Sequence, residues 1–456
     1  MEYITLFISL AVIAVVAYLL IKKVFPQMVL LVAGIVMISI TIVLTGNSHP
    51  PQSPTGFIGF DIFAVLKDSF STKMAGIGLM IMTIGGYVRY MKHIGASEML
   101  VSVTLKPLAR LKKHPYLATV LLIPIGQFLF MSSPSAAGFS MLLMVAIYPV
   151  IVRFGVSKIT AVSVITACTV FDLGPGSANA NQAAHIIGMD VVDYFLSKQV
   201  VVVIPTTLSL MVLYFFVNKY SDRKMKYQTV DDVEEHTLNP SIPKFYALLP
   251  VLPLILLVVF SAFFEFFSPP VILNTTLAML ICMFITYIIE LIRTRHVRKT
   301  TEDTRIFFDG MGTVFSTIVT LIVCADIFAR GLIGLGLIDM LIAGSQSIGM
   351  GNTGVNGIMT SAIFASSVLM GSGNASFFAF SPLVPDIIAN LGGSEAKMIL
   401  PMQLASSMGR AVSPIAGLMI ATSKMAGISS FDVARRNLIP LAGGAIVMFT
   451  LNALLL

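Results

Sequence analysis

Long apolar runs separated by short charged loops are the main feature of this sequence. They span residues 4–21, 26–45, 76–88, 199–218, 244–264, 271–291, 312–329 and 437–456. Most are close to the ~20 residues that an α-helix needs to cross a hydrocarbon core about 30 Å thick. Only 11% of the residues are charged, against about a quarter in soluble proteins. We therefore predict an all-α polytopic membrane protein with no room for a large soluble domain.

The first apolar run has the hydrophobicity of a secretory signal but lacks its other features. No basic segment precedes it, no small-residue cleavage site follows it, and Lys22 and Lys23 come after it. We expect a retained span. The cysteines Cys168, Cys282 and Cys324 lie in apolar sequence without metal-site spacing, so no cofactor is expected. We attribute the net charge of +7 to membrane topology rather than to nucleic-acid binding.

The basic residues predict the orientation of the chain. They cluster within residues 22–23, 89–93, 106–113, 153–158, 219–226, 293–299 and 435–436, whereas the loops 46–56, 265–270 and 345–357 contain neither Lys nor Arg. Because cytoplasmic loops are enriched in Lys and Arg, we assign the basic loops to the cytoplasm. Both termini are then outside, and two apolar stretches must enter the membrane without crossing it.

Two stretches have the composition of such re-entrant hairpins. The first spans residues 115–154, has basic residues at both ends, and carries Ser132-Ser133-Pro134-Ser135-Ala136-Ala137-Gly138 in its middle. The second runs from about residue 351 to 391 around Gly371-Ser372-Gly373-Asn374-Ala375-Ser376. Lipid does not tolerate irregular backbone, so each tip must be buried in protein or line a wet cavity.

An interrupted apolar helix follows each predicted hairpin. Residues 158–171 lead into a break that begins at Asp172-Leu173-Gly174-Pro175-Gly176, and residues 397–408 lead into one that begins at Gly409-Arg410 and includes Ser413-Pro414. Gly and Pro together end a helix because of their backbone geometry. Each half therefore has the same order of elements: crossing spans, a hairpin, a discontinuous helix and a last span.

A single offset of 239 residues relates these features. It takes three residues around the first tip onto identical residue types around the second, namely Met131, Ser133 and Phe139 onto Met370, Ser372 and Phe378. It also takes Asp190 onto Ser429, and we predict that both cap the final helix of their half. With five crossings in each half, the second half is upside down. Two inverted repeats with discontinuous helices are typical of secondary transporters that bind substrate near the midplane.

Tips and breaks at membrane depth suit an anionic substrate. Half-helix N-termini offer free N–H groups and a positive dipole end, and Ser and Asn add neutral hydrogen bonds. Arg410 lies in apolar sequence, where a charge is usually functional, and we expect it to bind a substrate carboxylate. By the same reasoning Asp172 is a candidate for coupling to Na⁺ or H⁺. The full set of expected substrate contacts is Ser132, Ser133, Ser135, Ser177, Asn179, Ser372, Gly373, Asn374, Ser376, Arg410 and Ser413.

Other interpretations remain open for single residues and for the function. A Ser in a membrane helix usually packs or bonds to its own helix. We expect Asp326 and Arg330 to pair near the surface and Gly34 to permit close helix packing. An intramembrane hydrolase, and with it any enzyme, is not expected, because no His lies beside a serine-rich tip. A channel also uses re-entrant loops, but paired breaks favour a carrier.

The chain resembles a known family in its motifs. Residues 370–377, 403–410 and 412–414, together with Tyr90-Met91-Lys92-His93-Ile94-Gly95-Ala96 and residues 425–429, resemble the DcuC family of C4-dicarboxylate carriers. The resemblance implies transport of succinate, fumarate, malate or aspartate across the bacterial cytoplasmic membrane, chiefly in anaerobic growth, by exchange, uptake or efflux. Carriers of amino acids or short-chain monocarboxylates are the alternatives.

The resemblance also implies an elevator-type homodimer with a static scaffold and a moving transport domain. Residues 1–114 and 244–350 would then be scaffold spans, residues 115–218 and 351–456 transport elements, and residues 219–243 a cytoplasmic linker. In the wider transporter group, hairpin tips hold substrate and cation together. On this basis Ser133 and Asn374 join Asp172 as expected cation contacts.

Overall fold

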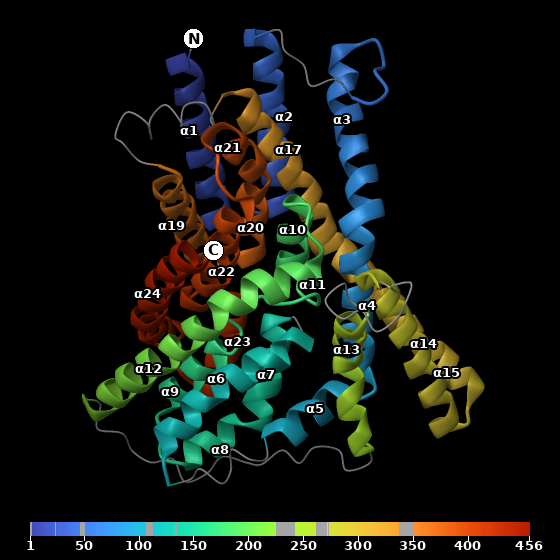
Figure 1. Cartoon of the computed structure of the whole chain (residues 1–456), viewed down its shortest axis with the longest axis vertical. Coiled ribbons are helices and arrows are strands. Elements are labelled where there is room, and N and C mark those ends of the chain that lie inside the picture. The colour runs from blue at the N-terminus through green and yellow to red at the C-terminus, as the bar shows by residue number, and fades with distance from the viewer. Residues whose placement is uncertain are drawn as a thin grey trace.

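The structure is a computed structural model that describes residues 2–22, 24–45, 51–105, 113–132, 135–224, 242–260, 271, 273–336 and 351–456. These residues form helices and turns, with no β-strand in the described part of the chain. Eight helical segments within these ranges are long and apolar enough to cross a membrane. They confirm the prediction of a multi-pass, all-helical membrane protein (Figure 1).

The first part of the chain contains two apolar helices, one long interrupted helix and a short helix. These are α1 (Glu2–Ile21), α2 (Pro26–Thr45), α3 (Ile58–Lys73), the π-helix η1 (Met74–Gly78), α4 (Leu79–His93) and α5 (Ala96–Leu105). Helical structure thus begins at Ile58, well before the apolar run predicted from residue 76. Four charged residues in α3, from Asp61 to Lys73, hide it from a hydropathy argument.

The corresponding part of the second half has a similar long helix. Its elements are the 3₁₀ helix η4 (Lys244–Val251), α13 (Leu252–Val259), α14 (Thr275–Thr294), α15 (Val297–Asp303), α16 (Arg305–Val314), the π-helix η5 (Phe315–Val319) and α17 (Thr320–Gly334). The π-helical interruptions begin at Met74 and Phe315, and 315 − 74 = 241, close to the predicted offset.

Glycine contacts bring these helices together across the two halves. A Cβ on Gly34 in α2 would lie 2.7 Å from the backbone of Ile327 in α17, which confirms the prediction of close packing there. A Cβ on Gly310 in α16 would lie 2.8 Å from Cα of Gly86 in α4. Neither site has space for a larger side chain.

The predicted pair of Asp326 and Arg330 is confirmed, with Arg330 Nε 2.9 Å from Asp326 Oδ2. Its expected place near the surface is wrong for the carboxylate, which is only 8% exposed. Lys73 Nζ, 3.4 Å from Oδ1 of Asp326, also compensates this buried charge. The contact joins α3 to α17.

Both predicted hairpins are helix–turn–helix units with capped tips. The first comprises α6 (Pro115–Ser132), α7 (Ala136–Ala146) and α8 (Tyr148–Arg153), and the second α19 (Asn352–Met370), α20 (Gly373–Phe380), η6 (Ser381–Leu383) and α21 (Val384–Leu391). Ser135 caps α7 by accepting from Gly138 N, and Ser372 caps α20 by accepting from Ala375 N. Gly371 ends α19 in the left-handed region at φ +70°, which favours glycine.

Both discontinuous helices are present, but the second break lies later than predicted. The elements are α9 (Lys158–Ala167), α10 (Ala178–Ile186), α22 (Glu395–Val412) and α23 (Gly417–Ala426). Helix α22 continues through Gly409 and Arg410, so placing Arg410 inside the break was wrong. Gly409 serves close packing instead, since a Cβ there would lie 2.5 Å from Phe364 O. The break follows from Pro414, which holds Ser413 extended.

The last helices begin at the predicted caps. They are α11 (Val191–Tyr194), which continues through the π-helix η3 (Phe195–Gln199) into α12 (Val200–Lys224), and α24 (Ser430–Leu455). Asp190 accepts from Val192 N at 2.8 Å, and Ser429 accepts from Phe431 N at 3.2 Å. Helix α12 extends into the predicted linker as far as Lys224, and residues 225–241 lie outside the described residues.

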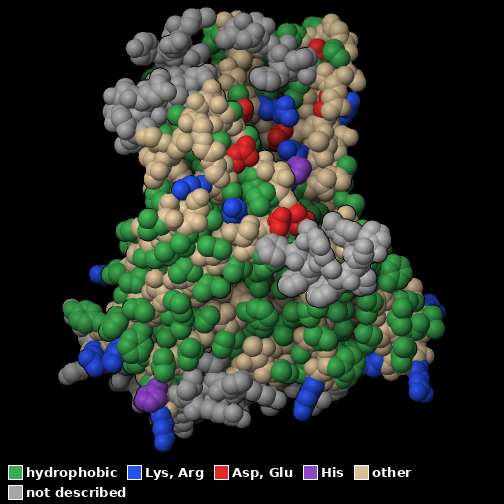
Figure 2. All heavy atoms as spheres, viewed as in Figure 1, with side chains coloured by type: hydrophobic (Ala, Val, Ile, Leu, Met, Phe, Trp, Pro, Cys, Tyr) green, Lys and Arg blue, Asp and Glu red, His purple; other side chains and the backbone are tan. Residues whose placement is uncertain are grey.

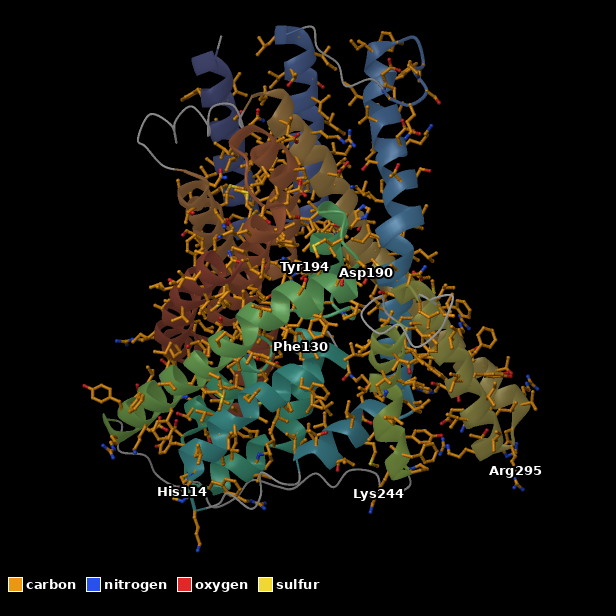
Figure 3. All side chains as sticks on the ribbon, viewed as in Figure 1. His114, Phe130, Asp190, Tyr194, Lys244 and Arg295 are labelled. Carbon is orange, nitrogen blue, oxygen red and sulfur yellow. The ribbon has the colours of Figure 1, made fainter. Side chains whose placement is uncertain are left out.

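Hairpins and discontinuous helices of the two halves pack on one another. Helix α19 lies along α22, α12 along α24, and α7 against α23. Basic side chains gather at one end of this assembly: Figure 2 shows Lys and Arg along the lower edge, below a band of hydrophobic side chains. His114, Lys244 and Arg295, which lie in or next to predicted cytoplasmic loops, are at that lower end in Figure 3.

Candidate functional site

A cavity of about 860 Å³ lies where α4, α5, α7 and α16 meet the first break and the second tip. Six of the predicted site residues line it: Ser135, Asp172, Ser177, Asn179, Asn374 and Arg410. They come from both halves of the chain. Ser135 and Asn374 are separated by the predicted offset, since 374 − 135 = 239, so equivalent positions of the two tips reach the same cavity.

Asp172 and Arg410 form a buried ion pair on the cavity wall. Nη1 of Arg410 lies 3.3 Å from Oδ2 of Asp172, and Nη2 lies 3.4 Å from Oδ1. These distances exceed the 2.7–2.9 Å typical of strong charged hydrogen bonds. Asp172 Oδ2 accepts shorter bonds from Ser407 Oγ at 2.7 Å and Asn179 Nδ2 at 2.9 Å. The carboxylate is therefore anchored mainly by neutral donors, and its contact with Arg410 is comparatively long.

Side chains satisfy the backbone of the first break. Gln403 Nε2 donates to Asp172 O at 2.6 Å, Gln199 Oε1 accepts from Gly174 N at 2.9 Å, and Asn181 Nδ2 donates to Pro175 O at 2.8 Å. Arg410 Nη2 donates to Thr169 O at 2.8 Å. Irregular backbone at membrane depth requires such internal partners, so these contacts fix the position of Asp172.

Sequence reasoning missed Gln199, Gln403 and Ser407 as site residues. Gln403, Ser407 and Arg410 are spaced i, i+4 and i+7, which places them on one face of α22. That spacing inside the family motif was the signal that would have found two of them. Gln199 carries no such signal, because it reaches the site from η3, whose position depends on the fold.

Among the predicted site residues that line the cavity, two buried side-chain atoms have no hydrogen-bond partner in the described part of the chain. Oδ1 of Asn179 is an acceptor and Nε of Arg410 a donor, and both are buried. Since Asn179 already donates through Nδ2 to Asp172, its oxygen is the free end of the amide. The site thus offers one open acceptor for a cation or hydroxyl group and one open donor for an anion.

Of the other predicted contacts, those that the structure describes do not line this cavity; they are Ser132, Ser372, Gly373, Ser376 and Ser413. Ser132 Oγ donates to Leu129 O, and Ser376 Oγ donates to Gly373 O, each within its own helix. Ser372 serves as the cap of α20. Gly373 lets the start of α20 approach α22, since its Cβ would lie 2.9 Å from Ser406 O. Ser413 is fully buried at the second break.

Two of the three expected cation contacts also line the cavity. Asp172 and Asn374 line the cavity, whereas Ser133 lies outside the described residues. In the described part of the chain no three His, Cys, Asp or Glu side chains gather as a metal site. A monovalent cation would therefore be held by one carboxylate with neutral oxygens around it.

Comparison with known proteins agrees with this geometry. A family model described as "DcuC: C4-dicarboxylate anaerobic carrier" matches residues 4–455. The Anaerobic C4-dicarboxylate transporter DcuC of Escherichia coli (strain K12) is 30% identical over 458 residues, covering 100% of this chain and 97% of the relative. A probable transporter of the same name from Vibrio cholerae is 31% identical over 445 residues, covering 97% and 96%.

Two solved transporters share the fold at low identity. The Alcanivorax borkumensis YdaH transporter has a TM-score of 0.60 and 13% identity, with 94% of this chain and 98% of that chain covered. Neisseria gonorrhoeae MtrF, titled as one of a class of antimetabolite efflux pumps, has a TM-score of 0.54 and 13% identity, with 94% and 95% covered.

These relatives are transporters, which confirms the expectation of a transporter rather than an enzyme. The family model and the relatives each span nearly the whole chain, so the similarity is not confined to one motif. The chain belongs to the DcuC family of anaerobic C4-dicarboxylate carriers.

Proposed function

We propose that this protein is a secondary active transporter of C4-dicarboxylates such as succinate, fumarate, malate and aspartate. The observation that carries the proposal is the buried guanidinium of Arg410, which lines the cavity and keeps Nε without a partner among the described residues. A guanidinium stays protonated and binds a carboxylate through parallel hydrogen bonds. The names of the family and of its relatives support the substrate class.

The cavity and its polar groups suit such a substrate. Its 860 Å³ falls within the ~300–1,000 Å³ of small-molecule sites and leaves space for a cation beside four carbons. Arg410 would bind one carboxylate, while Asn374, Ser135 and the capped N-terminus of α10 at Ser177 would contact the rest of the molecule.

Charge balance supports coupling to cations. Asp172 and Arg410 cancel, so the pair is neutral before substrate binds. A dianion adds two negative charges in a buried site, which is unfavourable without compensation. Two protons or monovalent cations would restore neutrality, with Asp172, Asn374 and the open oxygen of Asn179 as ligands for one of them. Because the Asp172–Arg410 pair is neutral without substrate, the unloaded carrier could also return across the membrane. Such a return would permit uptake or efflux as well as exchange.

We further propose two inverted repeats that move as an elevator. The offset of 239 between tip residues and the similar spacing of η1 and η5 support repeats. Residues 115–218 and 351–456 pack on one another and would form the transport domain. Residues 1–114 and 244–350 would form the scaffold.

Placement in the membrane follows from the same features. We assign the end that carries His114, Lys244 and Arg295 to the cytoplasm of a bacterial inner membrane, with both chain termini outside. The protein would act as a homodimer through scaffold spans. Cross-links between scaffold spans of two protomers should preserve transport, whereas a cross-link between a hairpin and the scaffold should stop it. Free transport in the second case would favour rocking over an elevator.

Uptake of labelled succinate into proteoliposomes tests the function. We expect saturable uptake that a sodium or proton gradient stimulates and internal fumarate accelerates. Non-saturating flux would indicate a channel. Saturable transport of amino acids or short-chain monocarboxylates without competition by succinate would replace the proposed substrate class.

A further inference from the structure

The cavity has a second cationic group besides Arg410. Arg89 and Lys92, spaced i, i+3 on α4, both line it, although their place in a basic cluster suggested only a role in topology. Glu98 on α5 is the one carboxylate that lines the cavity near them among the described residues. Two cations therefore face one anion here, and an excess positive charge remains.

The position of Arg89 is fixed by the packing of α4 on α16. A Cβ on Gly310 would lie 3.1 Å from Arg89 Cβ, so the arginine stem lies directly over α16. Nη1 of Arg89 donates to Thr313 Oγ1 at 2.8 Å and to Asp309 O at 3.2 Å. Both acceptors are neutral, and no carboxylate pairs with Arg89 in the described part of the chain. The guanidinium is held by two neutral acceptors and remains exposed, and no carboxylate compensates its charge among the described residues.

Ser97 supplies an independent sign of a ligand. Ser97 lies in the first turn of α5, lines the same cavity, and is only 5% exposed. Its Oγ is buried and has no hydrogen-bond partner among the described residues. A buried hydroxyl without a partner is unfavourable, and a carboxylate oxygen would satisfy it.

We propose that Arg89, Lys92 and Ser97 form a second anion subsite, which binds a carboxylate of the transported dicarboxylate on its way to or from Arg410. This inference rests on the proposed function and adds a staging site at the α5 end of the cavity. Arg89 and Lys92 are exposed, and exposed cations that line a cavity raise the local concentration of an anion and its rate of association. The subsite therefore acts on the rate of substrate capture and not on the turnover of bound substrate.

The test compares Arg89→Gln with Arg305→Gln in proteoliposomes. Arg305 is a matched control, because it is an exposed arginine on α16 that does not line the cavity. Initial rates are measured for labelled succinate supplied on the side of His114 and Lys244. At low ionic strength we expect Arg89→Gln to lower kcat/KM about fivefold to tenfold with kcat nearly unchanged, and the difference to shrink as salt is added. Arg305→Gln should match the wild type.

Two further variants separate charge from structure. Arg89→Lys keeps the charge and should keep at least half of the wild-type kcat/KM, and Ser97→Ala should lower it about twofold to fivefold, the loss of one neutral hydrogen bond. The subsite is overturned if Arg89→Gln equals Arg305→Gln at every ionic strength, or if Arg89→Lys is as slow as Arg89→Gln. An effect that vanishes in vesicles without anionic lipid would assign Arg89 to lipid headgroups instead. Wild-type protein that does not transport succinate would overturn the proposed function itself.

Discussion

The guanidinium of Arg410 lies against the carboxylate of Asp172, although 238 residues separate them in the chain. The predicted offset of 239 takes Asp172 to position 411, one residue beyond Arg410, so the two charges come from corresponding points of the two halves. Each was expected to be functional because it is a charge in apolar sequence. Their pairing makes the two residues neutral together in the absence of substrate. Removal of either residue leaves the charge of the other without its partner.

Substitution of Arg410 should act on substrate affinity. Arg410→Lys keeps the charge but loses the paired geometry, and we expect succinate to bind roughly 10- to 100-fold more weakly, the loss of a hydrogen bond to a charged group. Arg410→Ala should nearly abolish binding. The measurement is calorimetric titration of succinate into purified, monodisperse protein.

A structural role for Arg410 predicts a different result. Its Nη2 already binds Thr169 O, a carbonyl freed by the first break, so Arg410→Ala will also reduce thermal stability. If the surviving monodisperse protein binds succinate with wild-type affinity, Arg410 is a structural partner of the break and not a substrate ligand.

Neutralising Asp172 should uncouple transport from the cation. Asp172→Asn can still accept from Ser407 and leaves Arg410 with its full charge, so the dianion needs one cation fewer. We expect succinate–fumarate exchange to persist, while accumulation driven by a sodium or proton gradient falls several-fold, because one of the two proposed cations is no longer bound. Accumulation equal to that of the wild type would remove Asp172 from the coupling mechanism.

Asn374 and Ser376 form a matched pair for testing the second tip. Asn374 lines the cavity, whereas Ser376 is fully buried and donates within α20. Asn374→Ala should weaken succinate binding by roughly 1–3 kcal/mol, the loss expected when a buried polar partner is removed. Ser376→Ala should leave affinity within a factor of about two, because its only bonds are local. Equal affinities of the two variants would place the substrate away from this tip.

Local chemistry explains why much of the fold was predictable. Asp190 and Ser429 cap the helices that they were predicted to cap, because a capping side chain bonds only to the backbone of the next few residues. Ser135 and Ser372 are caps as well, although only the tips that contain them were predicted. Apolar runs likewise identify spans by composition alone. Helix α3 was missed since its charged residues break the apolar run.

The rest depends on contacts between distant segments. Gly409, followed by Pro414 in apolar sequence, indicated a break, but its role is the close approach of the carbonyl oxygen of Phe364, a residue far away in the chain. Gln199 reaches the first break and Arg89 reaches the cavity from helices whose positions the sequence pattern does not give. The sequence therefore predicted functional roles for Asp172 and Arg410, but not the ion pair between them.

Accessibility of the first hairpin tests its topology. Lys113 precedes the first described helix of the hairpin and Arg153 ends the last one, and both residues should face the cytoplasm. Single cysteines are placed at either position in a background that lacks the native three, which are all buried. An impermeant maleimide added outside intact cells should label neither position, and should label both after permeabilisation. Labelling of only one from outside would show that the segment crosses the membrane.

A second buried ion pair should stabilise the packing of the proposed transport domain. Asp222 Oδ1 lies 2.8 Å from Arg436 Nη1 and also accepts from Ser157 Oγ, while Oδ2 accepts from Thr160 Oγ1. The cluster joins α9, α12 and α24. Arg436→Met leaves the carboxylate buried without its counter-charge, which destabilises by roughly 3–5 kcal/mol.

We therefore expect the melting temperature of purified Arg436→Met to fall by several degrees, and the double variant Asp222→Leu with Arg436→Met to recover part of the loss, because no isolated charge remains. Arg298→Met is the control: its pair with Glu302 is exposed, at 94% and 67% of the two side chains, and such pairs contribute little. Succinate affinity should be unchanged in all three proteins, since the cluster does not line the cavity. A melting temperature for Arg436→Met equal to that of Arg298→Met would show that the buried pair does not hold these helices together.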